Sequence, residues 1–240
     1  MSSILAVGSV AYDSVKTPFG LAEEALGGSA TYFSIAASFF TKVFLVACVG
    51  QDFKKKDLAF LESRGIDLAG LEHLLGKTFR WSGEYEKNMN TAQTLETHLN
   101  VFADFSPTIP KNYRNHEFVF LGNIDPILQK SVLSQIKRPR LVACDTMNFW
   151  INGSFDSVLE TLKSVDVLII NEAETRQLSG ETSLLGAASK ILKWGPHTLV
   201  VKLGEYGAAL YHRNKKGLSV FGIPAYPVEE VHDPTGAGDS

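Results

Sequence analysis

The chain has 240 residues, of which 45% are hydrophobic and 20% are charged, and its formal net charge is -3. This composition is typical of a globular α/β protein with a sizeable core and differs from that of a disordered chain. The slightly acidic balance lacks the basic footprint of a nucleic-acid-binding protein, so we expect no nucleic acid as a partner. No apolar run is long enough to span a bilayer, and we expect no membrane association.

Cysteine usage and the first residues indicate the compartment. The two cysteines, Cys48 and Cys144, lie inside apolar runs that resemble strands. Buried thiols of this kind are typical of a reducing compartment and form neither a disulfide pattern nor a metal pattern. The N-terminus enters a predicted strand directly, without the basic start of a signal peptide. We therefore expect a cytoplasmic protein.

A short apolar run over residues 4–8 predicts the first buried strand. Tyr12 and Asp13 follow it. Ligands of open α/β sheets bind at the carboxyl ends of strands, so Asp13 is a candidate to bind the hydroxyl groups of a substrate. The alternative is an aspartate that only stabilises a turn.

A glycine pair, Gly27 and Gly28, precedes a predicted helix that is rich in small residues. The pair would let substrate hydroxyls approach backbone N–H groups closely, and Ser29 is suited to cap the start of the helix. Tyr32 lies in the first turn of this helix. A tight loop without a ligand is the alternative interpretation.

The segment of residues 78–103 has a different character from the rest of the chain. Phe79, Trp81, Gly83 and Tyr85 alternate with other residues, which predicts exposed strands. We interpret this segment as a small β-lid inserted into the α/β domain, with a contribution from residues 12–25. An edge hairpin without a gating role is the alternative.

The remaining pattern alternates buried strands with amphipathic helices. Strands are predicted over residues 42–49, 118–123, 141–145, 165–170 and 198–203, and helices over residues 53–64, 126–136, 155–162 and 183–194. A hairpin is predicted over residues 208–223. This alternation, without an internal repeat, predicts a doubly wound, mainly parallel sheet flanked by helices in a single domain over residues 1–240.

Polar side chains follow the predicted strands. Asn171 ends one of them, and Glu174 lies three residues later, so both could face one site across the first turn of a helix. An amide and a carboxylate there could organise the water shell of Mg²⁺, which is bound in proteins through few carboxylates. A capped helix start without a ligand is the alternative.

The last eight residues, 233–240, read Asp-Pro-Thr-Gly-Ala-Gly-Asp-Ser. Asp233 precedes a proline and marks a turn, and Gly236 and Gly238 let the backbone approach a ligand closely. A small-residue turn that opens a helix presents N–H groups that bind anions. Asp239, beside such a turn, is well placed to accept a proton from a group that attacks the bound anion.

This string resembles the C-terminal signature of the PfkB/ribokinase family of carbohydrate and nucleoside kinases. The glycine pair with its helix, the Val-Gly-x-Asp pattern at 49–52 and the Asn-x-x-Glu pattern at 171–174 also resemble elements of that family. The resemblance implies a ribokinase-like α/β fold with a small β-lid, which in the family excludes water and often forms a homodimer contact. Tyr32 departs from the pattern, because many sugar kinases of the family have Asn there.

The resemblance also implies ATP and Mg²⁺ as cofactors, and a role for each candidate residue. Asp239 would be the general base, beside an anion hole made by Gly236, Ala237 and Gly238. The implied substrate contacts are Asp13, Gly27, Gly28, Ser29, Tyr32, Asn123 and Asp145. The implied nucleotide contacts are Asn171, Lys202, Gly204, Gly207 and Thr235, and Glu174 would hold Mg²⁺ through water.

We expect a kinase that transfers the γ-phosphoryl group of ATP to a hydroxyl of a small carbohydrate. An adenosine-like nucleoside is an alternative acceptor, because Tyr32 and Trp81 could stack on a base. A non-catalytic sugar-binding or sensor protein on the same fold is a further alternative. Family members continue past the C-terminal signature, so we expect the chain to be a fragment or a shortened form.

Overall fold

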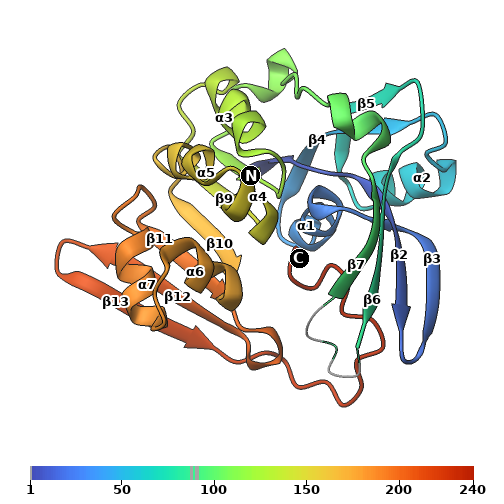
Figure 1. Cartoon of the computed structure of the whole chain (residues 1–240). Coiled ribbons are helices and arrows are strands. Elements are labelled where there is room, and N and C mark those ends of the chain that lie inside the picture. Colours follow the sequence, from blue (N-terminus) through green and yellow to red (C-terminus); the bar gives the residue numbers. More distant parts are fainter. Residues whose placement is uncertain (1, 87–88, 90–91) are drawn as a thin grey trace. The chain divides into compact units, whose positions relative to one another are not determined.

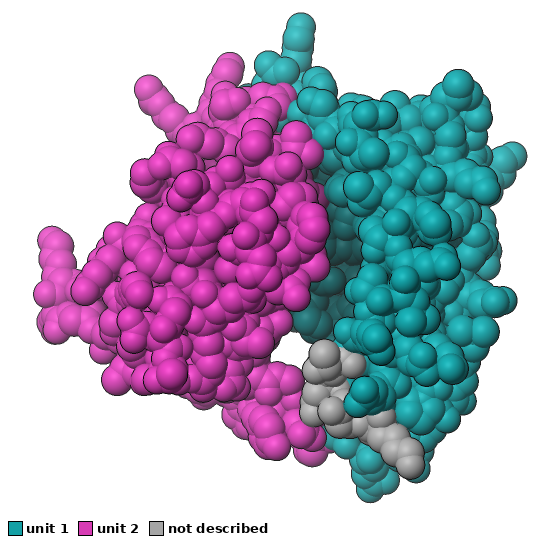
Figure 2. Space-filling model, in the orientation of Figure 1, with its two compact units in different colours: residues 1–116, 228–240 teal, residues 117–227 magenta. Residues whose placement is uncertain are grey.

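The computed structural model describes residues 2–86, 89 and 92–240. Its contacts divide the chain, expected from sequence to form one domain, into two compact units (Figure 2). Unit 1 comprises residues 1–116 and 228–240, and unit 2 comprises residues 117–227. In the described part of the chain, no helix has the length and apolar character needed to cross a membrane.

Unit 1 contains three parallel strands in the order β1-β4-β5: β1 (Ser3–Val7), β4 (Lys42–Gly50) and β5 (Asp67–Leu74). The middle strand is apolar along almost its whole length, as expected for a strand covered on both faces. Helix α1 (Ser29–Ser38) packs against β4 and β1, and α2 (Lys55–Ser63) packs against β5 (Figure 1). Gly65, with φ of 75°, follows the end of α2 in the left-handed conformation that is typical of a glycine after a helix.

A second, four-stranded sheet in unit 1 has the order β3-β2-β6-β7. It consists of β2 (Ala11–Thr17), β3 (Gly20–Gly27), β6 (Phe79–Tyr85) and β7 (Ala92–His98). Its strands come from the segment expected to form a lid, 78–103, and from the region around 12–25. Residues 87, 88, 90 and 91 of the expected lid lie outside the described residues. Short 3₁₀ helices follow at Asn100–Asp104 and Lys111–Tyr113.

A polar cluster ties this sheet to the end of β4. The buried hydroxyl of Thr78 donates to Asp52 Oδ1 (2.8 Å) and accepts a hydrogen bond from the Gly50 N–H (3.0 Å). The Arg80 guanidinium lies 2.8 Å from both Asp52 and Glu24. Burial opposes ionisation of Asp52, but the hydrogen bonds from Thr78 and the charge of Arg80 hold its pKa below the usual value. The cluster therefore holds the start of β6 next to the end of β4.

Unit 2 is built on a sheet in the order β13-β12-β11-β10-β9-β8. Its parallel strands are β8 (Phe118–Leu121), β9 (Leu141–Asp145), β10 (Val167–Asn171) and β11 (Thr198–Lys202), followed by the antiparallel hairpin β12 (Ala208–Asn214) and β13 (Gly217–Ile223). The helices are α3 (Pro126–Gln135), α4 (Asn148–Gly153), α5 (Phe155–Leu162), α6 (Glu172–Ser179) and α7 (Leu184–Ile191), with a 3₁₀ turn at Gly204–Tyr206. Helix α3 packs on α5, and α6 packs on α7 (Figure 1).

The α/β class with a mainly parallel sheet and flanking helices agrees with the sequence analysis. Apart from the 3₁₀ helices, two of the described elements were not predicted, β5 and the short helix α4. Strand β5 carries Asp67, Glu72 and His73, and only two of its eight residues are buried, so it has no continuous apolar run. Helix α4 has only six residues, which is too short for a helical period to be seen.

We expect Thr78→Val to lower the free energy of unfolding by about 1–3 kcal/mol, because valine fills the space but leaves the Gly50 N–H without its acceptor. Chemical denaturation of both proteins measures the difference. Thr97→Val, an exposed position on β7, is the matched control and should change stability by about 0.5 kcal/mol at most. Equal losses in the two variants would contradict a specific role for the Thr78 hydroxyl.

Candidate functional site

Glycine is required at positions 27 and 28 of unit 1, because other groups of the protein lie too close for a side chain. Gly28 has φ of 96°, and a Cβ at this position would lie 2.5 Å from the carbonyl oxygen of Ser9. A Cβ at Gly27 would lie 2.0 Å from Asp13 Oδ2. Any other residue at either position would therefore displace the backbone of the turn or the carboxylate of Asp13.

Asp13 lies on β2 with only 6% of its surface exposed. Its Oδ2 accepts a hydrogen bond from the Tyr32 hydroxyl at 3.2 Å. Burial raises the pKa of Asp13 to about 6, against hydrogen bonds from Tyr32 and the Gly28 backbone, and the carboxylates of Asp239 and Asp233 raise it further. A carboxylate with such a pKa changes charge close to neutrality.

The C-terminal segment folds as a run of turns over residues 235–239. The Thr235 N–H donates to Asp233 Oδ1 (2.9 Å), and the Asp239 N–H donates to the carbonyl of Gly236 (3.0 Å). The Ala237 N–H donates to the carbonyl of Pro234 (3.1 Å). Of the N–H groups expected to bind an anion, that of Ala237 is thus engaged inside the turn and would have to exchange this bond.

Gly236 rests directly on the ring of Tyr32. It has φ of 78°, and an added Cβ would lie 2.3 Å from Cδ1 and from Cε1 of Tyr32. Figure 1 shows the C-terminus beside α1, the helix that carries Tyr32. The structure therefore brings Asp13, Tyr32, Gly236 and Asp239 together within unit 1.

Tyr85 is a residue of this cluster that the sequence analysis did not select. Burial raises the pKa of its phenol, and the carboxylates of Asp233, Asp13 and Asp239 add to that effect. It ends β6, where it was recognised only as part of an alternating strand. The alternation of the sequence placed Tyr85 on the same strand face as Trp81 and Gly83. No other sequence pattern pointed to Tyr85 as a site residue.

Ser29 does not have the capping role that the sequence suggested. The residue that caps α1 is Gly28, without a side-chain hydrogen bond, and Ser29 is the first residue inside the helix. Its buried hydroxyl shares a hydrogen bond with Ser9 Oγ (3.2 Å) instead. Helix α1 therefore begins one residue earlier than a cap at Ser29 would place it. Only glycine fits at the cap position, because a Cβ there would lie 2.5 Å from the carbonyl oxygen of Ser9.

In unit 2, parallel strands bring three candidate residues to one edge of the sheet. Asp145 ends β9, and Asn171 and Lys202 end β10 and β11, where they pair in register. Lys202 Nζ lies 3.6 Å from Oδ2 of the buried Asp145. Asn123, after β8, accepts a hydrogen bond from Trp150 Nε1 at 3.0 Å.

Asn171 and Glu174 form a capping box at the start of α6. The Glu174 N–H donates to Asn171 Oδ1 (2.8 Å), and the Asn171 N–H donates to Glu174 Oε2 (2.9 Å). This reciprocal pair accounts for the spacing of the two residues by helix capping alone. Among the described residues, no group of three or more His, Cys, Asp or Glu side chains could hold a metal ion.

Gly204 and Gly207 bracket the 3₁₀ turn after β11, with φ of 60° and 100°. A Cβ at Gly207 would lie 2.0 Å from the carbonyl oxygen of Ile223. The packing of β13 therefore explains Gly207, whereas the exposed Gly204 needs glycine only for its backbone conformation.

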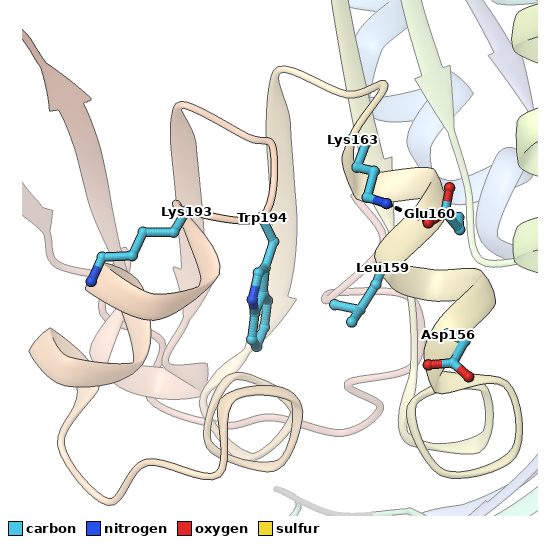
Figure 3. Close-up of a pocket in the computed structure, with 6 residues that line it drawn as sticks. All are labelled: Asp156, Leu159, Glu160, Lys163, Lys193 and Trp194. Carbon is cyan, nitrogen blue, oxygen red and sulfur yellow. Dashed lines mark hydrogen bonds and ion pairs between the residues drawn. The ribbon is translucent and has the colours of Figure 1, made fainter.

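A hollow of about 460 Å³ opens between α5 and the end of α7 (Figure 3). Leu159 and Trp194 form its apolar part, and Lys163 is paired with Glu160 at its rim. Asp156 and Lys193 complete the lining. No residue proposed from the sequence as a site residue lines this hollow.

The family model described as "pfkB family carbohydrate kinase" matches residues 2–240. A ribokinase of Arabidopsis thaliana is 40% identical over 95 residues, which are 37% of this chain and 24% of that protein. A nucleoside kinase of Methanocaldococcus jannaschii is 25% identical over 204 residues, 82% of this chain and 62% of that protein. The chain thus matches less than two thirds of the length of either relative.

Solved structures share the ribokinase fold. That of the M. jannaschii nucleoside kinase has a TM-score of 0.77 at 23% identity and covers 100% of this chain and 82% of that one. A ribokinase II-like protein of E. coli, solved in complex with ATP and Mg²⁺, has a TM-score of 0.79 at 20% identity, covering 100% and 83%. These neighbours confirm the doubly wound fold class predicted from the sequence.

We expect Asp13→Asn to be more stable than the wild type at pH 7. The raised pKa means that the folded chain holds this proton more tightly than the unfolded chain does. The resulting stabilisation is present below the unfolded pKa of about 3.9 and is lost as the pH rises through about 6, a change of about 2–3 kcal/mol.

Denaturation of the wild type and of Asp13→Asn from pH 4 to pH 8 measures how the free energy of unfolding of each protein depends on pH. Asp104→Asn, an exposed acid in the 3₁₀ helix at 100–104, is the control and should follow the wild type. If Asp13→Asn and the wild type depend on pH identically, Asp13 does not titrate as the structure implies.

Proposed function

Because the chain belongs to the pfkB family of carbohydrate kinases, we propose that it transfers the γ-phosphoryl group of ATP to a hydroxyl group of a small carbohydrate. The observation that carries this proposal is the cluster in unit 1, where the buried carboxylate of Asp13 interacts with that of Asp239 beside the Gly236 turn. One carboxylate is suited to hold the acceptor, and the other to take its proton.

Asp13 is the acceptor-binding group of the proposal. Its carboxylate sits against Gly27 and faces the hydroxyl of Tyr32. Ionised above its pKa of about 6, it accepts hydrogen bonds from acceptor hydroxyls. Gly27 leaves room for this carboxylate, and Gly28 adopts the backbone conformation that the turn before α1 requires.

Asp239 is the general base of the proposal. It closes the C-terminal turn and is only partly exposed. Phosphoryl transfer depends mostly on positioning and charge stabilisation, and a base aligned with the attacking hydroxyl adds to these. N–H groups of Gly236, Ala237 and Gly238 would stabilise negative charge on the transferred group, with Ala237 giving up its bond to Pro234.

The polar edge in unit 2 suits the nucleotide. ATP would supply the phosphoryl group, and Mg²⁺ bound with it would neutralise negative charge on the phosphates. Lys202, beside Asp145, offers a cation, and Gly204 leaves the backbone accessible. Asn171 and Glu174 fit a metal held through water, since a capping box fixes the carboxylate while Mg²⁺ keeps most of its waters. Thr235 is a further candidate contact. ATP and Mg²⁺ occur together in the related E. coli structure.

A nucleoside is the alternative acceptor. One relative is a nucleoside kinase, and two tyrosines, Tyr32 and Tyr85, lie in the same cluster as Asp13. Aromatic rings can pack on a base or on the apolar face of a sugar. The further alternative, a sugar-binding protein without turnover, would use Asp13 and the glycine pair alone.

The lid sheet is the surface proposed for a homodimer. Phe19, Leu21, Leu95 and Leu99 lie on or beside its strands with 45–62% of their surface exposed. Exposed apolar groups of this kind favour association. A cytoplasmic location agrees with two cysteines that are both buried and free.

We expect Asp239→Asn to lower kcat by about 10²-fold or more, because the acceptor hydroxyl loses its base. ADP release with Mg-ATP is measured across a panel of sugars, sugar phosphates and nucleosides. Acceptor binding, followed by calorimetry, should be retained in the variant.

The control is Glu229→Gln, an exposed acid ahead of the C-terminal turn, which should keep full activity. The active member of the panel identifies the acceptor class. Full activity of Asp239→Asn would refute the base assignment. Sugar binding without ADP release would favour the non-catalytic protein.

A further inference from the structure

Tyr32 connects two parts of unit 1 that are far apart in the sequence. It lies in the first turn of α1, where its N–H donates to the carbonyl of Gly28 at 3.1 Å. The helix start, held by the glycine pair, therefore sets the direction of its side chain. From there the side chain reaches both the strand that carries Asp13 and the C-terminal turn.

The hydroxyl end of Tyr32 orients Asp13. It donates to Asp13 Oδ2 at 3.2 Å, and the same oxygen lies 2.0 Å from the position of a Cβ on Gly27. With Gly27 on one side and the tyrosine hydroxyl on another, the carboxylate has little freedom to rotate. A carboxylate held in one orientation presents its remaining acceptor positions in fixed directions.

The ring of Tyr32 supports the C-terminal turn. Its Cδ1 and Cε1 atoms lie 2.3 Å from the position of a Cβ on Gly236, so the peptide backbone of this turn rests on the ring. The turn continues through the Asp239 N–H, which donates to the carbonyl of Gly236 at 3.0 Å. The position of Asp239 thus depends on a backbone that Tyr32 contacts directly.

We propose that Tyr32 is a positioning residue with two separable roles: its hydroxyl orients the acceptor-binding carboxylate of Asp13, and its ring seats the Gly236 turn that carries Asp239. The proposal rests on the proposed kinase function for its catalytic meaning. Its structural content, a hydrogen bond to Asp13 and a ring under Gly236, can be measured without turnover.

Tyr32→Phe removes the hydroxyl and keeps the ring. We expect KM for the acceptor to rise by about five- to tenfold, the value of one lost hydrogen bond, with kcat and the KM for ATP unchanged. The acid limb of kcat/KM should move to higher pH, because the lost bond had lowered the pKa of Asp13. The other groups that face Asp13 are the Gly28 backbone and the side chains of Tyr85, Asp233 and Asp239.

Tyr32→Leu removes the hydroxyl and most of the surface under Gly236. We expect kcat to fall by about tenfold or more beyond Tyr32→Phe, because the turn with Asp239 loses its support. Hydrogen exchange of the segment 233–240 at short times should become faster in Tyr32→Leu and stay as in the wild type in Tyr32→Phe. Tyr226→Phe, at a position 86% exposed in unit 2, is the control.

The carboxyl carbon of Asp13, titrated by NMR and assigned with Asp13→Asn, gives a readout that needs no activity. A higher pKa in Tyr32→Phe supports the hydroxyl role, and an unchanged titration overturns it. Equal exchange in the Leu and Phe variants overturns the ring role. Absence of turnover in the wild type refutes the kinase proposal, while the titration and the exchange still decide the roles of Tyr32.

Discussion

Space around two glycines is the constraint on which the cluster in unit 1 depends. The Asp13 carboxylate fills the volume that a side chain at position 27 would need, and the Tyr32 ring fills the volume that a side chain at position 236 would need. Each glycine thus makes room for a functional group and not for a ligand alone. Since Gly236 also has φ of 78°, both sterics and backbone conformation fix its identity.

Electrostatics follows from this packing. Asp13 is buried with a raised pKa, and its neighbours are the phenols of Tyr32 and Tyr85 and the carboxylates of Asp233 and Asp239. On the proposed function, the buried Asp13 holds hydroxyl groups of the acceptor and the partly exposed Asp239 accepts a proton. Because its pKa is raised, keeping Asp13 ionised at neutral pH lowers the stability of the folded chain.

Unit 2 reaches its polar edge by a different principle. Parallel register brings the ends of β9, β10 and β11 together, so Asp145, Asn171 and Lys202 need no special turn to meet. The ion pair of Lys202 with the buried Asp145 and the capping box of Asn171 with Glu174 then order these groups. The geometry of this edge is fixed mainly by strands and helix ends.

The sequence by itself determined the features that depend on neighbouring residues. The apolar run at 42–49 predicted β4, and the spacing of Asn171 and Glu174 contained the capping box, because both are local patterns. Strand β5 was not predicted. It is only partly apolar because it lies at the edge of the sheet, and that position is a property of the tertiary structure. Asp13, Gly236 and Asp239 were selected from the sequence, but only the tertiary structure brought them close to Tyr32. The Tyr32 ring and the Gly236 turn are far apart in the chain and meet through packing, so no periodic pattern in the sequence predicts their contact.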